Sequence, residues 1–150
     1  MFYLSEYLEV NRDEYYQRLS AISQHGDWTG WIKFFLGAIT QQARKNVSQV
    51  KAIMNLYEAT KVQVRDITRS QHTAQLVDTL FDRPIFRVSD VVQRSGINKQ
   101  TLHGLLRQLQ QPEGPLTILR EGIGRRPAIY AFPALLNICE GKTVLPATAV

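Results

Sequence analysis

A run of helical segments, glycine turns and a hairpin between His72 and Phe132 constrains the fold of this chain more than any other feature. Apolar residues at helical spacing predict a first helix over residues 72–81, which Pro84 ends. After a short extended run, Ser89 is a favourable N-cap residue for a second helix. Gly96 follows that helix and supplies the left-handed conformation common at helix C-termini.

The third predicted helix covers residues 99–111, and Asn98 precedes it as the expected cap. Its inward side carries Leu102, Leu105, Leu106 and Leu109. Its outward side carries Lys99, Gln100, His103, Arg107 and Gln108. A helix that is apolar on one side and basic and polar on the other is typical of a recognition helix in the DNA major groove.

Two strands, residues 116–120 and 128–132, are predicted around a loop that holds two glycines and two adjacent arginines. The glycines supply positive φ angles for a tight hairpin, and the arginines are expected at its tip. This order of elements predicts a winged helix-turn-helix, with the hairpin as its wing.

Such a unit usually contacts nucleic acid. Arginine can pair with guanine edges and glutamine with adenine edges, while lysine and arginine also bind phosphates. The predicted DNA-binding residues are Lys99, Gln100, His103, Arg107, Gln108, Arg125 and Arg126.

The charge distribution agrees with this prediction. The 150-residue chain has a formal net charge of +5, and its apolar fraction of 44% is that of a globular protein. Residues 85–130 hold seven basic and three acidic side chains, whereas residues 1–31 hold two basic and five acidic ones. Basic charge therefore gathers on the segment expected to bind a polyanion.

A single cysteine, Cys139, allows no disulfide within the chain and predicts no metal-ligand cluster. We expect it to be a small buried apolar residue, and we expect no cofactor. The sequence contains no apolar run long enough to span a membrane and no secretory signal, so the expected location is the cytoplasm.

The first part of the chain is predicted to be helical. Ser5 is expected to cap a short turn, Asn11 a helix over residues 12–24, and Asp27 the longest helix. The aromatic residues of these segments recur at helical spacing, which predicts a core made of Tyr15, Tyr16, Trp28, Trp31, Phe34 and Phe35.

The longest predicted helix carries an apolar stripe that the short preceding helix is too small to cover. The stripe needs a neighbour to pack against it. Three candidates are the preceding helix, the winged helix and a second copy of the chain. We predict a homodimer whose interface contains Ile32, Leu36, Ile39, Val47, Val50, Met54 and Tyr57. The expected organisation is a mainly α fold: helices over residues 1–69, the winged helix over 70–140, and a frayed tail over 141–150.

Several short sequence words near the start resemble the Fic family. They are YLSEYL at residues 3–8, RDEYY at 12–16, GDW at 26–28, GWI at 30–32 and FFL at 34–36. In that family this run follows the AMP-transfer signature H-P-F-x-[DE]-G-N-G-[RK] and forms the closing helices of the fold. A winged helix at the carboxyl end is common there, so the resemblance implies the C-terminal part of a Fic protein.

The signature itself is absent from this chain. None of the three histidines, His25, His72 and His103, is followed by Pro-Phe, and no glycine pair has phosphate-loop spacing. We therefore expect a non-catalytic regulatory or targeting segment that binds DNA. The alternative is a protein-interaction or dimerisation module that regulates a Fic catalytic core. AMP transfer would need residues from an upstream segment or another chain.

Overall fold

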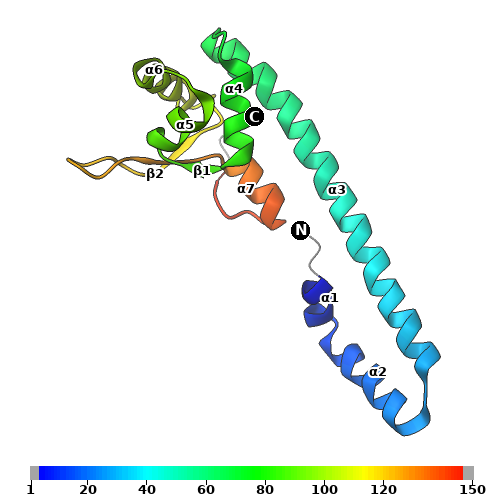
Figure 1. Cartoon of the computed structure of the whole chain (residues 1–150). Helices are drawn as coiled ribbons and strands as arrows, with labels where there is room; N and C mark the ends of the chain where they lie inside the picture. The colour runs from blue at the N-terminus through cyan, green and yellow to red at the C-terminus, as the bar shows by residue number, and fades with distance from the viewer. Residues whose placement is uncertain (1–3, 147–150) are drawn as a thin grey trace. The chain divides into compact units, whose positions relative to one another are not determined.

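A computed structural model describes residues 4–146. The fold is mainly α with a small antiparallel sheet, as the sequence predicts (Figure 1). In chain order the elements are α1 (Leu4–Val10), α2 (Arg12–His25), α3 (Trp28–Thr68), α4 (Thr73–Asp82), β1 (Ile85–Phe86), α5 (Val88–Ser95), α6 (Lys99–Leu109), β2 (Thr117–Arg120), β3 (Ile129–Ala131) and α7 (Pro133–Glu140). Within the described residues, no helix is both long and apolar enough to cross a membrane.

The chain forms two compact units, unit 1 (Met1–Lys51) and unit 2 (Ala52–Val150). The division lies inside α3 and earlier than the boundary expected after residue 69. The reason is packing, because Val64 is fully buried in the core of unit 2 and Ile67 packs against that core. The last part of α3 therefore belongs to unit 2.

Asp27 and Asn98 cap helices as the sequence predicts. Asp27 Oδ1 accepts the Gly30 amide at 2.9 Å, and Asn98 Oδ1 accepts the Gln100 amide at 2.8 Å. Each bond satisfies an amide that the first helical turn leaves without a partner. These two caps fix the starts of α3 and α6.

Two other expected caps are wrong, and a third is right in position only. Helix α5 begins at Val88, so Ser89 lies inside it, and Asp90 accepts the Arg87 amide at 3.1 Å instead. Ser5 likewise lies inside α1. Asn11 is the N-cap residue of α2 as expected, but its side chain makes no cap hydrogen bond. Its Nδ2 donates instead to the Tyr7 carbonyl at 2.8 Å.

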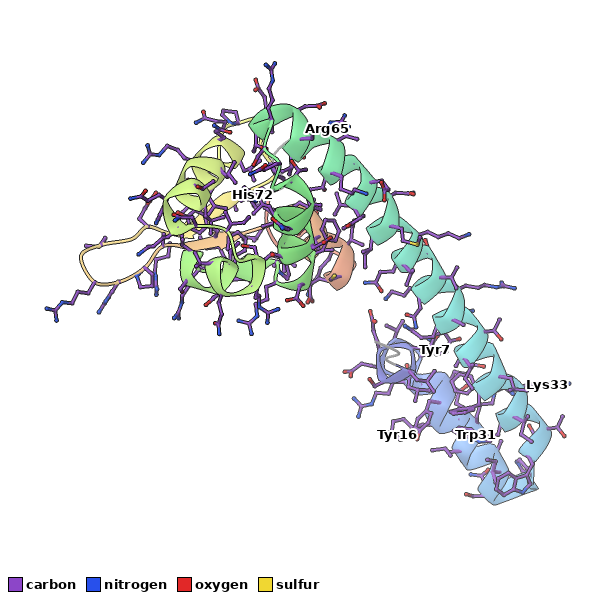
Figure 2. The ribbon with its side chains drawn as sticks, turned by 45° about the horizontal axis from the view of Figure 1, so that its top comes forward. Tyr7, Tyr16, Trp31, Lys33, Arg65 and His72 are labelled. Atoms are coloured by element: carbon purple, nitrogen blue, oxygen red, sulfur yellow. The ribbon has the colours of Figure 1, made fainter. Side chains whose placement is uncertain are left out.

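Unit 1 packs α1 and α2 against one side of α3 through aromatic rings (Figure 2). Tyr7 lies 6.3 Å from Phe34, and Tyr15 lies 5.6 Å from Trp31, between ring centroids. Phe34 is buried and Trp31 is half-buried. The expected core role is wrong for Trp28 and Tyr16, which are 61% and 55% exposed, because α1 and α2 cover only one side of α3.

Unit 2 has its own apolar core, built from the helices α4 to α7, the sheet and the end of α3. The sheet order is β1-β3-β2, with β3 antiparallel to both neighbours. The buried leucines of α6 all contribute to this core, as predicted: Leu102, Leu105, Leu106 and Leu109. The alternation of buried and exposed residues along α6 therefore fixes which side faces outward.

Tyr57 attaches α3 to α4 within unit 2. Its ring packs edge-on against Phe81 at 5.1 Å, and its hydroxyl donates to Asp78 at 2.6 Å. This hydrogen bond to a carboxylate is the main reason that the pKa of Tyr57 is raised above its ordinary value.

The predicted frayed tail differs from the structure at residues 144 and 145. Asn137 Oδ1 accepts the Val144 amide at 2.8 Å, and its Nδ2 donates to the Leu145 carbonyl at 2.7 Å. The Asn137 side chain thus holds residues 144 and 145 on α7. Residues 147–150 of the predicted tail lie outside the described residues.

Candidate nucleic-acid interface

The turn between α5 and α6 sets the direction in which α6 leaves the core. Gly96 adopts φ 69°, a left-handed conformation that costs glycine little, and its amide donates to the Val92 carbonyl at 3.1 Å. Ile97 is buried directly after this glycine. The buried side chain and the Asn98 cap together anchor the start of α6.

The outward side of α6 contains every polar residue that the sequence places there. Lys99, Gln100, His103, Arg107 and Gln108 are all exposed. Gly104 lies among them, and the space where its side chain would be is open. The exposed side of α6 is therefore a polar, basic surface with an open position at its centre.

The loop between β2 and β3 ends in a narrow turn that extends from the helices of unit 2 (Figure 1). Ile123 and Arg126 exchange two backbone hydrogen bonds, of 3.1 Å and 3.0 Å. The two residues between them are Gly124, with φ 56°, and Arg125. Both arginines are exposed, so the hairpin presents two cations at its tip as predicted.

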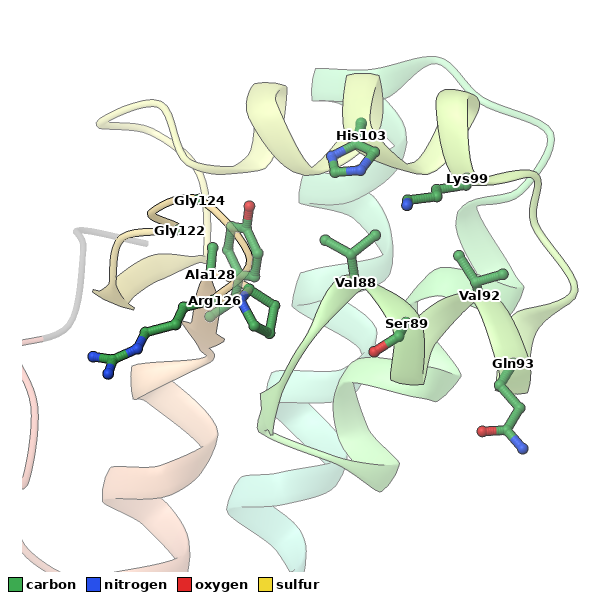
Figure 3. Close-up of a pocket in the computed structure, with 12 residues that line it drawn as sticks. Val88, Ser89, Val92, Gln93, Lys99, His103, Gly122, Gly124, Arg126 and Ala128 are labelled. Atoms are coloured by element: carbon green, nitrogen blue, oxygen red, sulfur yellow. The ribbon is translucent and has the colours of Figure 1, made fainter.

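A cleft of about 620 Å³ lies between α5, α6 and this hairpin (Figure 3). The Lys99 ammonium and the His103 ring extend from α6 toward the cleft, above Val88 of α5. Arg126 contributes to the rim, and its guanidinium points to the other side of the hairpin. The complete lining is Val88, Ser89, Val92, Gln93, Lys99, His103, Gly122, Gly124, Arg126, Pro127, Ala128 and Tyr130.

The lining of this cleft contains no acidic residue, while it includes one lysine, one arginine and one histidine. Cations near an apolar surface attract an anion more strongly than cations in open solvent, because fewer water molecules screen them. The cleft and the exposed side of α6 can therefore bind a phosphate backbone or another anion.

The structure brings only part of the predicted DNA-binding set together. Lys99, His103 and Arg126 line the same cleft, whereas four predicted residues do not line it: Gln100, Arg107, Gln108 and Arg125. The sequence interpretation missed Ser89 and Gln93, which line the cleft from α5. Their signal was weak, because a serine and a glutamine on a helix surface are ordinary solvated residues.

The predicted dimer interface is partly exposed and partly used inside the chain. Ile32, Leu36, Val47 and Val50 are 50–57% exposed on the part of α3 that belongs to unit 1. Met54, in unit 2, is also exposed. Ile39 is half-buried. Tyr57 packs on Phe81 and is therefore committed to the core of unit 2.

Cys139 is exposed, which corrects the expectation of a buried residue. It lies near the end of α7, next to the exposed Glu140. Desolvation is the main cause that raises the pKa of its thiol, so the thiolate form is disfavoured. Across residues 4–146, no group of three or more His, Cys, Asp or Glu side chains is placed to hold a metal ion.

No protein-family model matches the chain.

Proposed function

We propose that unit 2 is a winged helix-turn-helix that binds duplex DNA, with α6 as the recognition helix and the β2–β3 hairpin as the wing. The observation that carries this proposal is the acid-free cleft that joins Lys99 and His103 of α6 to the hairpin. The order of α4, β1, α5, α6, β2 and β3 agrees with such a domain. Exposed cations on α6 and on the hairpin suit phosphates at the two edges of a groove in DNA.

The residues divide into two roles by their chemistry. Lys99, Arg125 and Arg126 are suited to phosphates, which fix the position of the protein on the duplex. Gln100, Arg107 and Gln108 on the exposed side of α6 are suited to base edges, which provide sequence choice. Ser89 and Gln93 offer further hydrogen bonds from α5.

A salt titration with unrelated duplexes tests DNA binding. The chain should bind several 25-base-pair duplexes at about 50 mM salt, and its affinity should fall steeply toward about 200 mM because phosphate contacts release counterions. The measurement is fluorescence anisotropy of labelled duplexes. Absence of binding to any duplex at about 50 mM salt would contradict the proposal.

We further propose that the chain is a non-catalytic targeting segment of the Fic family. The support is the set of sequence words between residues 4 and 36, which fall on α1, α2, the turn between α2 and α3, and the start of α3. Tyr3, the first residue of these words, lies outside the described residues. In this proposal the winged helix would bring an AMP-transferring core to DNA.

The residues present do not fit the binding of ATP for AMP transfer. The family signature supplies a histidine base and a glycine-rich phosphate loop, and neither occurs in this sequence. We predict that the chain alone transfers no AMP when it is incubated with labelled ATP, Mg²⁺ and a cell lysate. Labelled protein above a heat-killed control would show that the prediction is wrong.

The second candidate function is self-association through α3. The exposed stripe favours it, because Ile32 and Ala43, Leu36 and Val47, and Ile39 and Val50 are each eleven residues apart. A repeat of eleven residues has about 3.67 residues per turn, so these positions stay on one side of a helix. A second copy of the chain could cover this side over five turns.

We predict that glutamate at Val50 shifts the protein from dimer to monomer, because it places a charge in an apolar seam. Light scattering should give twice the chain mass of 17.1 kDa for the wild type and a value near the chain mass for Val50→Glu. Ser48→Glu is the matched control, since Ser48 is exposed and outside the stripe. A wild type that is monomeric at about 10 μM, where specific homodimers with Kd near 1 μM are mostly associated, would contradict this prediction.

A further inference from the structure

The tip of the β2–β3 hairpin carries an exposed apolar residue, Ile123, that does not pack in the core of unit 2. Ile123 is 75% exposed, more than any other large apolar residue of unit 2 in the part of the chain that the structure describes. It stands among residues suited to nucleic acid, since Arg125 and Arg126 follow within three positions. A single exposed isoleucine is common on protein surfaces. A binding role for Ile123 therefore has to be argued from its neighbours and from the rigidity of the turn.

Ile123 and Arg126 lie directly opposite one another across the turn. They exchange both backbone hydrogen bonds, as a hydrogen-bonded pair in an antiparallel ladder does. Side chains of directly opposed residues lie on the same face of a hairpin, with their Cβ atoms about 5.5 Å apart. The side chains of Ile123 and Arg126 therefore start on the same face of the tip. The Arg126 side chain extends away from the cleft (Figure 3).

The turn holds this face in place. Gly124 takes a left-handed conformation with φ 56°, which a short hairpin turn requires. The two sides of the loop also lie close together at Gly122 and Ala128. A Cβ added at Gly122 would stand 3.1 Å from the Ala128 amide nitrogen. Arg120 also donates to the Pro127 carbonyl across the loop at 3.4 Å. Ile123 is thus held in solvent by a closed hairpin.

We propose that Ile123 and Arg126 form a tip that enters the minor groove of DNA, where Ile123 wedges against a base step and bends the duplex. This inference rests on the proposed DNA binding and adds its mode. Minor-groove proteins combine arginines with apolar wedges that unstack a base step and kink the duplex. The narrow tip, the adjacent cations and the exposed apolar side chain provide both parts of that combination.

The wedge gives sequence preference without a hydrogen bond to a base. Pyrimidine–purine steps such as TA unstack most easily, whereas A-tracts are stiff. The tip should therefore prefer a duplex with a TA step at its centre over a matched duplex with an A-tract there. The preference for the TA step belongs to Ile123, because the narrow minor groove of an A-tract attracts an inserted arginine more strongly and Arg126 therefore acts in the opposite direction.

The experiment measures bending and unstacking separately from binding. Two 25-base-pair duplexes, one with a central TA step and one with a central A-tract, carry dyes at their ends for energy transfer. A further TA duplex carries 2-aminopurine beside the step, whose fluorescence rises when it unstacks. The full chain and the variants Ile123→Ala and Ile123→Leu are compared at about 50 mM salt, where phosphate contacts are strong.

The wild type should bend the TA duplex and raise the 2-aminopurine signal. Ile123→Ala should lose both signals and bind the TA duplex roughly tenfold more weakly, while its affinity for the A-tract duplex stays within about twofold. Ile123→Leu should retain both signals, because it keeps the apolar volume. The substitutions are in an exposed turn, and circular dichroism should give the same unfolding midpoint for all three proteins.

The failures of the two proposals are distinguishable. If the wild type binds both duplexes but Ile123→Ala bends and unstacks the TA duplex equally well, the proposed wedging by Ile123 is wrong, while the proposal of DNA binding is unaffected. If the wild type binds neither duplex, both proposals are wrong. Bending that Ile123→Ala loses and Ile123→Leu keeps would support both.

Discussion

Alanine at both Arg125 and Arg126 should weaken binding to every duplex by roughly a hundredfold, because each lost charged contact costs about 1.5 kcal/mol, or about tenfold. The two side chains are exposed on a turn that backbone hydrogen bonds hold, so their removal should leave the fold unchanged. The logarithm of affinity against the logarithm of salt concentration should also become flatter by about two units. Anisotropy titrations at several salt concentrations measure both effects.

Two controls separate this loss from a general loss of charge. Arg12→Ala removes a cation from unit 1 and should leave the salt slope unchanged. Arg107→Ala, if Arg107 reads a guanine, should cost roughly 1–3 kcal/mol on the preferred sequence only. An unchanged salt slope in the double variant would mean that the hairpin tip does not contact phosphates.

Alanine at Gly114 should destabilise unit 2 by about 3 kcal/mol, the upper end of the cost of overpacking. Gly114 is buried in the turn after α6, and an added Cβ would stand 2.9 Å from Leu109 Cα and closer still to the Leu109 carbonyl. The obstacle is backbone that is itself fixed, because the Leu116 amide donates to the same carbonyl at 3.1 Å. Urea unfolding followed by circular dichroism measures the loss.

The same substitution at Gly104 should have the opposite sign. Gly104 lies in the middle of α6 with open space around the position of its missing side chain. Alanine there should stabilise the helix by about 1 kcal/mol, since glycine is the poorer helix former. If alanine changed the free energy of unfolding by the same amount at both glycines, crowding against the backbone would not be the reason for glycine at position 114.

The elements of unit 2 follow from local sequence. The spacing of the four α6 leucines predicts its buried side, and the structure buries all four. Gly96 and Asn98 mark the turn before α6, and Gly124 marks the hairpin tip. These features are local, because backbone conformation and amide satisfaction within a few residues decide them.

The errors occur where a residue's role depends on distant neighbours. Ser89 is the exception and is decided locally, because Asp90 accepts the Arg87 amide and the helix already begins at Val88. Trp28, Tyr16 and Cys139 are apolar or aromatic, and yet they are exposed. Periodicity identifies the apolar side of a helix but does not say which part of that side a neighbour covers.

By itself the sequence determined the mainly α fold, the positions of most helices and the basic outward side of α6, since spacing, turn residues and charge are properties of short segments. Only the tertiary structure decided that Ser89 and Gln93 share a cleft with Lys99 and His103, and that Ile123 stands opposite Arg126 at the tip of a closed hairpin. The physical reason is that the cleft joins three separate segments, whose approach is set by the burial of the core of unit 2 and by the register of the β2–β3 pair.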